Sequence, residues 1–589
     1  APGLLAVPVE AFMARAAVLL ATLSLGCTGL VHSRSDATQP PGLADAANPA
    51  GDVAPEPVAP HGPACEAPAP DNPSRYHHAV GYEAFVRSFM DSDGDGIGDL
   101  DGLASRLDYL NDGDPATDAD LGIDLLWLMP VTESPSYHGY DVADYGRVEA
   151  DYGGDAAFDR FVAEARRRGI RVVLDLVLNH SSSEHPWFVE SAAGLSSARR
   201  DWYVWSPEKL DWQKPWGPGQ TWFRKGDAWY YALFWQGMPD LNWRTPAVRD
   251  EMTAIAKAWV ARGADGYRLD AVRYLVEDGP GAGQADAPDT HAHLRAFRAA
   301  LAAERPDVLL VGEVWERTEV VAPYFGSSPS DEIGMLFDFD LAQALVQGIR
   351  SGRAGTVRDA LCGRLRGWPA WGAAGTFLTN HDMVRVATEV EAGGPATLRL
   401  AAALLFGLPG TPWIYYGEEI GMRNGGSGDD AAKRLPMQWA AGDGAGFTTG
   451  APWLEPASTA VADTVAGQTA SPDSLLSLYR RLVRARAAHP ALRAGATRVA
   501  RADPAAPSLL VVSRESGDDR LLLVFNLSGK PAAAAIAPDA VPAATAFADL
   551  LGGQGATRAS AASPLALGTL DAWGFRLLHA VPGTSAPAL

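Results

Sequence analysis

The chain has 589 residues, of which 47% are hydrophobic and 20% charged, as in an ordinary globular protein of two or three domains. Its formal net charge of −22 repels phosphate backbones, so we expect no nucleic-acid partner. The only cysteines are Cys27, Cys65 and Cys362, whose spacing predicts neither a disulfide framework nor a CxxC metal pair.

The N-terminal region is typical of an export signal. The basic stretch Met13 to Arg15 precedes the apolar run 16–26, which is too short to cross a bilayer. The run ends in "LSLGC", which resembles a bacterial lipobox, although Ser24 and Leu25 differ from the usual residues. We expect residues 1–27 to direct export to the extracellular space, the periplasm or the cell surface, with membrane attachment through a lipid on Cys27.

A low-complexity segment follows at residues 28–75. It contains "PPGLADAANPAGDVAPEPVAPHGPACEAPAP", which has no apolar periodicity and is rich in Pro and Ala. This composition predicts a disordered tether between the export segment and a folded domain.

From residue 76 to residue 492, short apolar runs alternate with helical patterns. The helical patterns include 156–169 and 396–408, and the runs predict eight strands, at 82–89, 123–131, 170–178, 266–272, 307–315, 335–340, 375–382 and 412–420. Eight such units predict an α/β fold, a (β/α)₈ TIM barrel with a parallel sheet. An insertion at 181–243, after the third strand, predicts a subdomain. Nine tryptophans between Trp187 and Trp243 suit either its core or a sugar-binding cleft.

The C-terminal region has a different periodicity. A helical pattern at 474–492 is followed by alternation of period two in "SLLVVSRESGDDRLLLVFNLSG" (508–529), which predicts a hairpin that turns at residues 517–519. We therefore expect an antiparallel all-β domain at 493–589.

Polar residues gather at the carboxyl ends of the predicted barrel strands, where the loops of a (β/α)₈ barrel build one site. Arg268 and Asp270 are two residues apart and so face the same side of a strand. One strand-end aspartate is more often a cap than a catalytic group. A full set from several strands instead indicates an active site: Asp175, Asn179, His180, Arg268, Asp270, Glu313, His381 and Asp382.

These segments resemble the α-amylase superfamily of retaining glycoside hydrolases, family 13, over residues 76–589. The matching motifs are "HGYDVADY" (138–145), "DLVLNH" (175–180), "MPDLN" (238–242), "GYRLDAVRY" (266–274), "GEVW" (312–315) and "FLTNHD" (377–382). The resemblance implies that the substrate is an α-glucan or maltooligosaccharide. It also implies a covalent glycosyl-enzyme intermediate between two carboxyl groups about 5 Å apart.

The same resemblance implies a role for each motif residue. Asp270 would be the nucleophile, kept ionised by Arg268, and Glu313 the general acid and base, which needs a raised pKa. Asp382 would stabilise the transition state, and Asp175 would hold Arg268. The expected sugar-binding residues are Tyr140, Asp141, His180, Arg268 and His381.

The loop "DSDGDGIGDL" after the first strand predicts a structural Ca²⁺ site. Its acidic spacing matches the first nine positions of an EF-hand loop, but position 12 is Gly102 instead of Glu. Clustered carboxylates repel one another unless a cation neutralises them, and related enzymes carry Ca²⁺ in this loop. The expected ligands are Asp91, Asp93, Asp95, the carbonyl of Ile97, and Asp99.

Substrate specificity is only partly readable. "MPDLN" resembles the group between the oligo-1,6-glucosidases and the neopullulanases, and the small Ala271 favours α-1,4 links. Arg273 and Tyr274 depart from the Lys-His of many α-amylases, and "RLPMQW" (434–439) resembles α-glucosidases and trehalose synthases. Our first hypothesis is an exported, monomeric α-amylase of endo- or broad action, which cuts α-1,4 links in starch, glycogen or maltooligosaccharides. The alternatives are an exo-α-glucosidase or oligo-1,6-glucosidase, a transglycosylating or trehalose synthase-like relative, and a non-catalytic binding protein, against which the complete catalytic set argues.

Overall fold

The computed structural model describes residues 64–71, 74–329, 331–426, 428–537, 541, 546–552, 557–558 and 564–581. The expected export segment, residues 1–27, and the expected tether as far as residue 63 lie outside this part of the chain. Among the described residues, none of the helices combines the length and the apolar character needed to cross a membrane.

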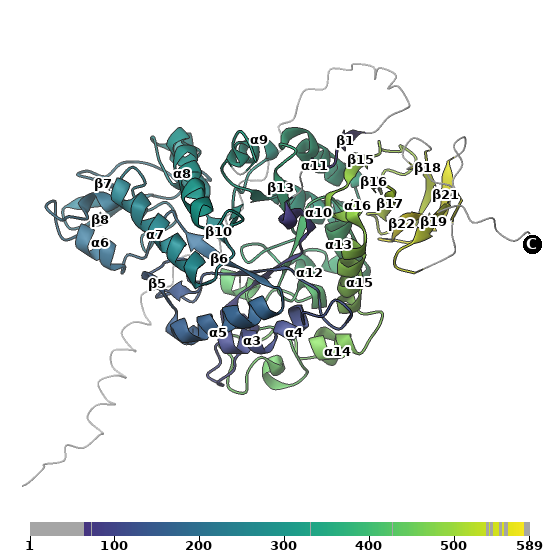
Figure 1. Cartoon of the computed structure of the whole chain (residues 1–589), viewed down its shortest axis with the longest axis horizontal. Helices are drawn as coiled ribbons and strands as arrows, with labels where there is room; N and C mark the ends of the chain where they lie inside the picture. Colours follow the sequence, from purple (N-terminus) through teal and green to yellow (C-terminus); the bar gives the residue numbers. More distant parts are fainter. Residues whose placement is uncertain are drawn as a thin grey trace, which may run out of the picture. The chain divides into compact units, whose positions relative to one another are not determined.

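Eight parallel strands close into a barrel, which confirms the predicted fold class (Figure 1). Each strand hydrogen-bonds to the next in chain order, and β14 pairs with β2 to close the ring. The strands are β2 (Gly81–Ala84), β3 (Leu125–Leu128), β6 (Arg171–Val177), β10 (Gly266–Asp270), β11 (Leu309–Gly312), β12 (Met335–Phe337), β13 (Ala373–Thr376) and β14 (Thr411–Tyr415).

Most barrel strands are shorter than their apolar runs predicted. The run at 82–89 divides into β2 and the short helix α2 (Val86–Phe89), and the run at 412–420 divides into β14 and the 3₁₀ turn Glu418–Ile420. Residues past the strand ends, such as Met129, Leu178 and Val272, stay buried, so hydrophobicity continues after the pairing stops. Apolar content alone therefore overestimates strand length.

Helices surround the barrel and present an apolar face to it. In α5 the buried residues Phe158, Phe161, Val162 and Ala165 recur at helical spacing. The longer helices are α5 (Gly154–Arg167), α7 (Pro246–Arg262), α8 (Pro288–Glu304), α10 (Phe339–Ser351), α11 (Ala354–Gly367), α13 (Pro395–Gly407) and α15 (Leu475–Ala488). The shorter ones include α3 (Leu100–Ser105), α4 (Leu107–Leu110), α9 (Thr318–Val321), α12 (Val386–Glu389), α14 (Val465–Thr469) and α16 (Pro490–Ala494).

The insertion after β6 contains helix α6 (Pro186–Ser191) and a small antiparallel sheet. The strands β7 (Trp205–Ser206), β8 (Trp222–Lys225) and β9 (Ala228–Tyr231) pair in the order β7-β9-β8. Figure 1 labels α6, β7 and β8 together at one end of the described fold. Trp222 and Trp243 are buried, whereas Trp235 keeps 47% of its surface exposed. Part of the tryptophan cluster is therefore core.

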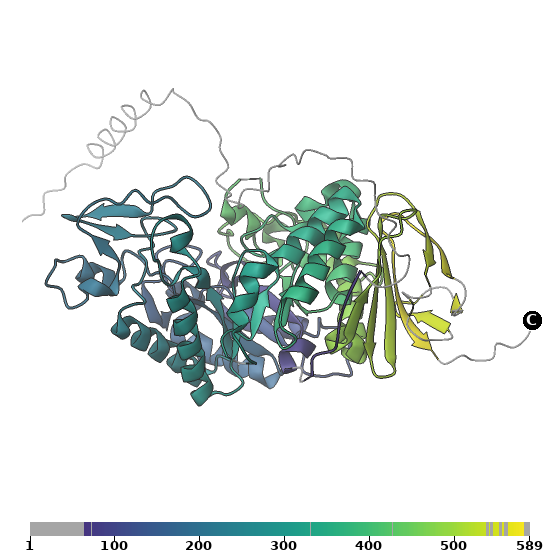
Figure 2. The same ribbon diagram turned by 90° about the horizontal axis from the view of Figure 1, so that it is seen from above.

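Figure 2 shows an antiparallel sheet at the C-terminal end, most of whose strands are yellow-green to yellow. Its strand order is β1-β15-β16-β17-β22-β19-β20. The strands are β15 (Ala496–Val499), β16 (Leu509–Ser516), β17 (Asp519–Asn526), β19 (Ala546–Asp549), β20 (Thr557–Arg558) and β22 (Phe575–Val581), and β18 (Ala532–Ile536) pairs separately with β21 (Leu565–Leu570). In the β16–β17 hairpin Ser516 pairs with Asp519, which leaves a two-residue turn. Alternate side chains of β17 face the barrel core, including Leu521, Leu523 and Phe525.

The first strand of this sheet corrects two expectations. Residues 64–67 do not belong to a disordered tether, because β1 (Cys65–Ala67) pairs with β15. The expectation that the cysteines form no disulfide is also wrong, because Cys65 is bonded to Cys362 of α11. The Cα atoms are 5.5 Å apart although 297 residues separate the two cysteines in sequence. Tertiary folding brings them together, and spacing along the chain carries no sign of it.

Candidate active site

Strand β10 directs Arg268 and Asp270 to the same side, as their two-residue spacing predicted. Arg268 Nη1 donates to Asp270 Oδ1 at 2.7 Å. The parallel register places Arg268 opposite Asp175 of β6, and the same nitrogen donates to both Asp175 oxygens at 3.0 and 3.2 Å. Burial raises the pKa of Asp175 to about 6, against the opposing effect of Arg268. The two strands thus form a buried ion cluster at one edge of the barrel.

Arg268 also joins Asp270 to Glu313, which follows β11. Its second terminal nitrogen lies 2.8 Å from Glu313 Oε2, so one guanidinium contacts both carboxylates. The backbone N–H of Ala271 donates to the same Glu313 oxygen at 3.0 Å. Ala271 has a φ of 50°, in the left-handed region that L-residues seldom adopt. This turn at the end of β10 orients Glu313 toward the ion cluster.

The surroundings of Glu313 hold its carboxyl group near the point of ionisation at neutral pH. Burial, together with the negative charges of Asp270 and Asp382, raises its pKa to about 7 against the opposing effect of Arg268. A carboxyl group with this pKa can give up and take back a proton close to pH 7.

Asp382 lies in the loop after β13 and is held by two cationic side chains. Arg434 Nη2 donates to its Oδ1 at 2.8 Å, and His381 Nε2 lies 3.1 Å from its Oδ2. Burial favours the neutral acid, but His381 and Arg434 outweigh it and hold the pKa of Asp382 well below its usual range. Its side chain is 35% exposed, so it stays ionised at the mouth of the site.

His381 lies behind Asp382 and is fully buried. Its Nδ1 is 2.6 Å from Glu83 Oε1 of β2, and its Nε2 is 2.6 Å from the Tyr140 hydroxyl. Burial lowers the pKa of His381, but Asp382 and Glu83 outweigh it and raise the pKa to about 9. The imidazole is therefore cationic at neutral pH between two carboxylates.

Tyr140 and Asp141 come from the loop after β3. The Tyr140 ring stacks on His381 with a centroid separation of 5.5 Å, and its hydroxyl donates to Asp175 at 3.1 Å. Asp141 is buried and accepts hydrogen bonds from the hydroxyls of Ser134 and Ser136. Tyr140 thus belongs to the ion cluster, and Asp141 orders the loop that carries it.

His180 follows β6 and is also buried, beside the Phe234 ring of the insertion. Burial lowers its pKa, so the imidazole is neutral at pH 7. Its Nε2 is buried without a hydrogen-bond partner among the described residues, so this atom is available to a ligand. Within the described part of the chain, His180 makes no hydrogen bond or ion pair with the three expected catalytic carboxylates, although the charge of Asp270 acts on its pKa.

Arg273 and Tyr274, where the family pattern is interrupted, form a separate network. Arg273 makes two hydrogen bonds to Asp286, at 3.0 and 2.6 Å, and a third to Glu316 at 2.9 Å. Tyr274 packs against the insertion through Trp216. Arg273 therefore fixes the loops after β10 and β11.

The acidic loop after β2 brings together three of its four aspartates. Carboxylate oxygens of Asp91, Asp93 and Asp99 lie within 4.8 Å of one another, while Asp95 accepts the amide of Ile97. Asp91 also accepts hydrogen bonds from Gly96 and from the Thr448 hydroxyl. Three converging hard oxygen donors fit Ca²⁺, so the donor set agrees with the ion predicted for this loop.

Several residues of the site were not singled out from the sequence. Glu83 lies within an apolar strand run, and Trp127 of β3 donates through its indole nitrogen to Asp175 at 3.2 Å. Arg434 begins "RLPMQW", a motif that indicates specificity and not a role beside Asp382, and Lys433 donates to the backbone carbonyl of Asp382 at 2.8 Å. Arg434 could have been found as a cation inside a recognised motif. No feature of the sequence pointed to Glu83 or Trp127.

Comparison with known proteins identifies related enzymes over most of the chain. The family model described as alpha amylase, catalytic domain, matches residues 83–495. Alpha-amylase 3 of Dictyoglomus thermophilum is 37% identical over 461 residues, covering 77% of this chain and 85% of the relative. Glucan 1,6-alpha-glucosidase of Streptococcus pneumoniae is 31% identical over 510 residues, covering 77% and 92%. The crystal structure of an alpha-amylase from H. orenii matches with a TM-score of 0.74 and 35% identity, covering 86% of this chain and all of that one.

Proposed function

The chain belongs to the family of alpha-amylase catalytic domains, and from this premise we propose that it hydrolyses α-1,4-glucosidic links in starch, glycogen or maltooligosaccharides. The single observation that carries the proposal is that Arg268 contacts both Asp270 and Glu313. One guanidinium spans only a short distance, and retaining glycosidases need their two carboxyl groups about 5–5.5 Å apart.

In the proposed first step, Asp270 attacks the anomeric carbon while Glu313 gives its proton to the departing glycosidic oxygen. A covalent glycosyl ester forms as the carbon–oxygen bond to the leaving sugar breaks. Glu313 then takes a proton from water, which attacks the ester and releases Asp270. The pKa of about 7 supports both roles of Glu313, because each step leaves it in the form that the other requires.

Asp382 supplies negative charge beside the reacting sugar, where the transition state is oxocarbenium-like. His381 and Arg434 keep Asp382 ionised and fix its position. Tyr140 offers a flat ring for the sugar in the same subsite, and the unpartnered Nε2 of His180 can bond a sugar hydroxyl.

The α-1,4 preference is supported by Ala271, the residue after the proposed nucleophile. Its left-handed backbone suits a small side chain and disfavours a β-branched one, so a methyl group is all that stands at this position beside Asp270. The alternative is an exo-acting glucosidase or a transglycosylating enzyme. It is favoured by "RLPMQW", whose Arg434 bonds Asp382, and by similarity to a protein named glucan 1,6-alpha-glucosidase.

A product profile separates these functions. The purified chain is incubated with maltoheptaose, isomaltotriose and maltose, and samples from the earliest times are separated by chromatography. An α-amylase yields a mixture of maltooligosaccharides from maltoheptaose and leaves isomaltotriose intact. Glucose as the only early product would contradict endo-action, and trehalose from maltose would indicate an isomerising enzyme.

A structural Ca²⁺ in the loop after β2 is part of the proposal. Asp91, Asp93 and Asp99 would hold it, and it would neutralise their mutual repulsion close to the first barrel strand. We also propose export, because a disulfide between Cys65 and Cys362 persists in oxidising compartments. We further propose that a lipid on Cys27 attaches the chain to a membrane and that the protein is a monomer. Mass spectrometry of the mature chain tests for the lipid.

A further inference from the structure

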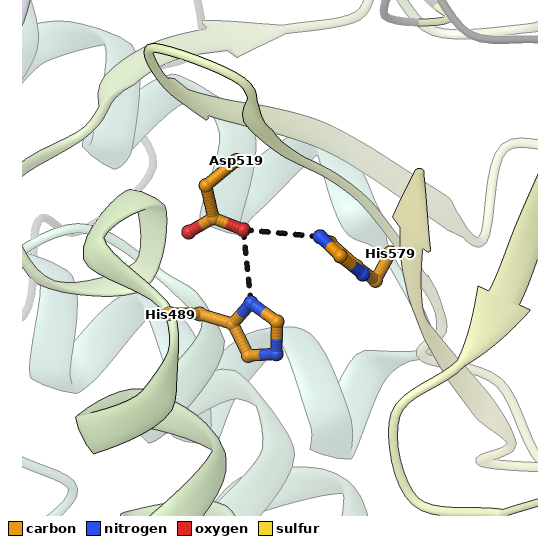
Figure 3. A group of neighbouring side chains, drawn as sticks. All are labelled: His489, Asp519 and His579. Atoms are coloured by element: carbon orange, nitrogen blue, oxygen red, sulfur yellow. Dashed lines mark hydrogen bonds and ion pairs between the residues drawn. The ribbon is translucent and has the colours of Figure 1, made fainter. Parts of the chain in front are cut away.

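Three potential metal ligands converge far from the proposed catalytic residues in sequence. His489 lies between helices α15 and α16, Asp519 begins β17, and His579 lies in β22 (Figure 3). His489 Nδ1 is 2.9 Å and His579 Nε2 is 3.2 Å from the same oxygen, Oδ1 of Asp519. The three ligand atoms all lie within 4.8 Å of one another.

Sheet register explains how two of these residues meet. In the antiparallel pair β17–β22, His579 is opposite Leu521, and Asp519 lies two residues before Leu521 on the same face. Asp519 and His579 are therefore diagonal neighbours across the two strands, within reach of long side chains. Leu521 belongs to the core shared with the barrel, so this face of the sheet points toward the helices that carry His489.

The carboxylate of Asp519 is held in a fixed orientation. Its Oδ2 accepts the backbone N–H of Ala491 at 2.8 Å, which leaves Oδ1 directed at the two imidazoles. A hydrogen bond to the second oxygen of a carboxylate is the kind of support that orients a metal ligand. The two imidazole rings lie side by side, with centroids 4.6 Å apart.

We propose that His489, Asp519 and His579 bind a divalent transition-metal ion, with Zn²⁺ as the best fit. Two imidazole nitrogens and one carboxylate oxygen are a common donor set for Zn²⁺, and water takes the fourth tetrahedral position. Bonds of about 2.0–2.1 Å place tetrahedral ligand atoms about 3.3 Å apart, so the observed contacts need only small shifts. Imidazole donors distinguish this site from the all-oxygen loop after β2.

The surroundings allow an ion to enter and bind. The side chains of His489, Asp519 and His579 keep 17%, 15% and 30% of their surface exposed, so the site is covered but reachable. A neutral imidazole presents its lone pair once its proton moves to the other ring nitrogen.

The ion would act as a cross-link. It would connect the end of α15, the last long helix of the barrel, with two strands of the C-terminal sheet. Since the folded chain would bind the ion and the unfolded chain would lack the assembled site, binding would raise thermal stability. None of the three residues belongs to the proposed catalytic set, so turnover should not depend on the ion.

Isothermal titration of ZnCl₂ into the full-length chain tests the proposal, with excess Ca²⁺ present to saturate oxygen-donor sites. We expect one ion with a dissociation constant in the micromolar range or tighter. H489N and H579N should each weaken binding at least tenfold. The matched control is H291N, because His291 also pairs with a carboxylate, Glu332 at 2.8 Å, and its side chain is also 17% exposed. Equal zinc affinity in all four proteins would overturn the proposal, as would the absence of binding to the unsubstituted chain.

A second measurement needs no variant. Co²⁺ replaces Zn²⁺ in tetrahedral nitrogen and oxygen sites and then gives strong visible absorption, which octahedral Co²⁺ in water lacks. We expect the full-length chain to show this absorption at one equivalent of Co²⁺ and to lose it when Zn²⁺ is added. A spectrum like that of aqueous Co²⁺ would contradict the assignment. Removal of zinc by a chelator with little affinity for Ca²⁺ should lower the melting temperature and leave starch hydrolysis unchanged.

Discussion

The backbone N–H of Ala271 donates a hydrogen bond to Glu313 Oε2 at 3.0 Å, and Ala271 makes this contact from a φ of 50°. Strand β10 ends one residue earlier, at Asp270. The left-handed residue therefore turns the chain so that one peptide joins the proposed nucleophile to the proposed acid. Backbone strain at such a position costs on the order of 1–3 kcal/mol and is kept where the surrounding structure enforces it.

Substitution of Ala271 tests this turn. A β-branched residue tolerates positive φ poorly, so A271V should lower the melting temperature and reduce kcat/KM on maltoheptaose by about tenfold or more. A271G is the matched control, since glycine adopts the same backbone without strain and keeps the N–H. It should retain most activity. Equal kinetics for the two variants would show that the backbone at residue 271 has no role in catalysis.

The pH dependence follows from Glu313. Its pKa is raised above the ordinary value to about 7, so the proton needed by the leaving group is present below pH 7 and lost above it. We expect kcat/KM on maltoheptaose to fall about tenfold per pH unit on the alkaline side. With α-maltosyl fluoride, whose leaving group needs no proton, E313Q should retain kcat/KM and show no alkaline fall. If kcat/KM of the unsubstituted chain and of E313Q fell in the same way at alkaline pH, a group other than Glu313 would be responsible.

The proposed nucleophile gives the largest expected loss. D270N removes the attacking carboxylate while keeping its size, so kcat should drop by a factor on the order of 10³ or more on every substrate. α-Maltosyl fluoride should restore the activity of E313Q but not that of D270N, because D270N lacks the carboxylate that forms the glycosyl ester. Mass spectrometry of the fluoride reaction in E313Q should detect an added maltosyl group on the peptide with Asp270. Full activity in D270N would exclude the proposed mechanism.

Arg268 should contribute both to the stability of the fold and to the pKa of Glu313. R268K keeps the charge but cannot contact Asp175, Asp270 and Glu313 together, and breaking a buried ion pair costs about 3–5 kcal/mol. The pKa of Glu313 should also rise, since Arg268 lowers it, and this would move any residual alkaline limb to higher pH. R244K is the control, because the Arg244–Asp278 pair is exposed and worth little.

Removal of Ca²⁺ should lower stability through the loop after β2. Chelation is expected to lower the melting temperature, and D93N, which removes one exposed member of the group, should weaken the response to added Ca²⁺. D112N is the control, because Asp112 lies in another acidic loop and bonds Thr117 instead. An unchanged melting temperature after chelation of the unsubstituted chain would argue against the ion.

Much of the fold was readable because burial in a barrel leaves a strong pattern. All eight barrel strands lie within or beside apolar runs, and the β16–β17 hairpin turns where Gly517 and Asp518 predicted. Strand ends were less accurate, since Leu269 and Val272 are both fully buried although only the first lies in β10. Hydrophobicity reports burial, whereas pairing depends on the backbone.

Site residues at the ends of strands could be predicted from the sequence. Residue pairs that only tertiary folding brings together could not. Arg268 and Asp270 meet through local geometry, as their spacing indicates. Glu83 reaches His381 across 298 residues, and Cys65 reaches Cys362 across 297. No local pattern specifies such pairs, because each depends on how distant strands and helices pack.

The pairing of Arg268 with Asp175 has a consequence for the assembly of the barrel. The two residues are register partners on neighbouring parallel strands, and both side chains are almost completely buried. A slip of β10 by two residues would set the guanidinium beside Val173 or Val177 and leave the buried Asp175 without its cation, at a cost of several kcal/mol, although Arg268 would keep Asp270 of its own strand. In a strand with only apolar side chains, by contrast, a two-residue slip sets one valine in the place of another and costs little free energy. The ion pair between Arg268 and Asp175 therefore also specifies the register of β10 against β6. Only this register brings together the residues of the proposed active site.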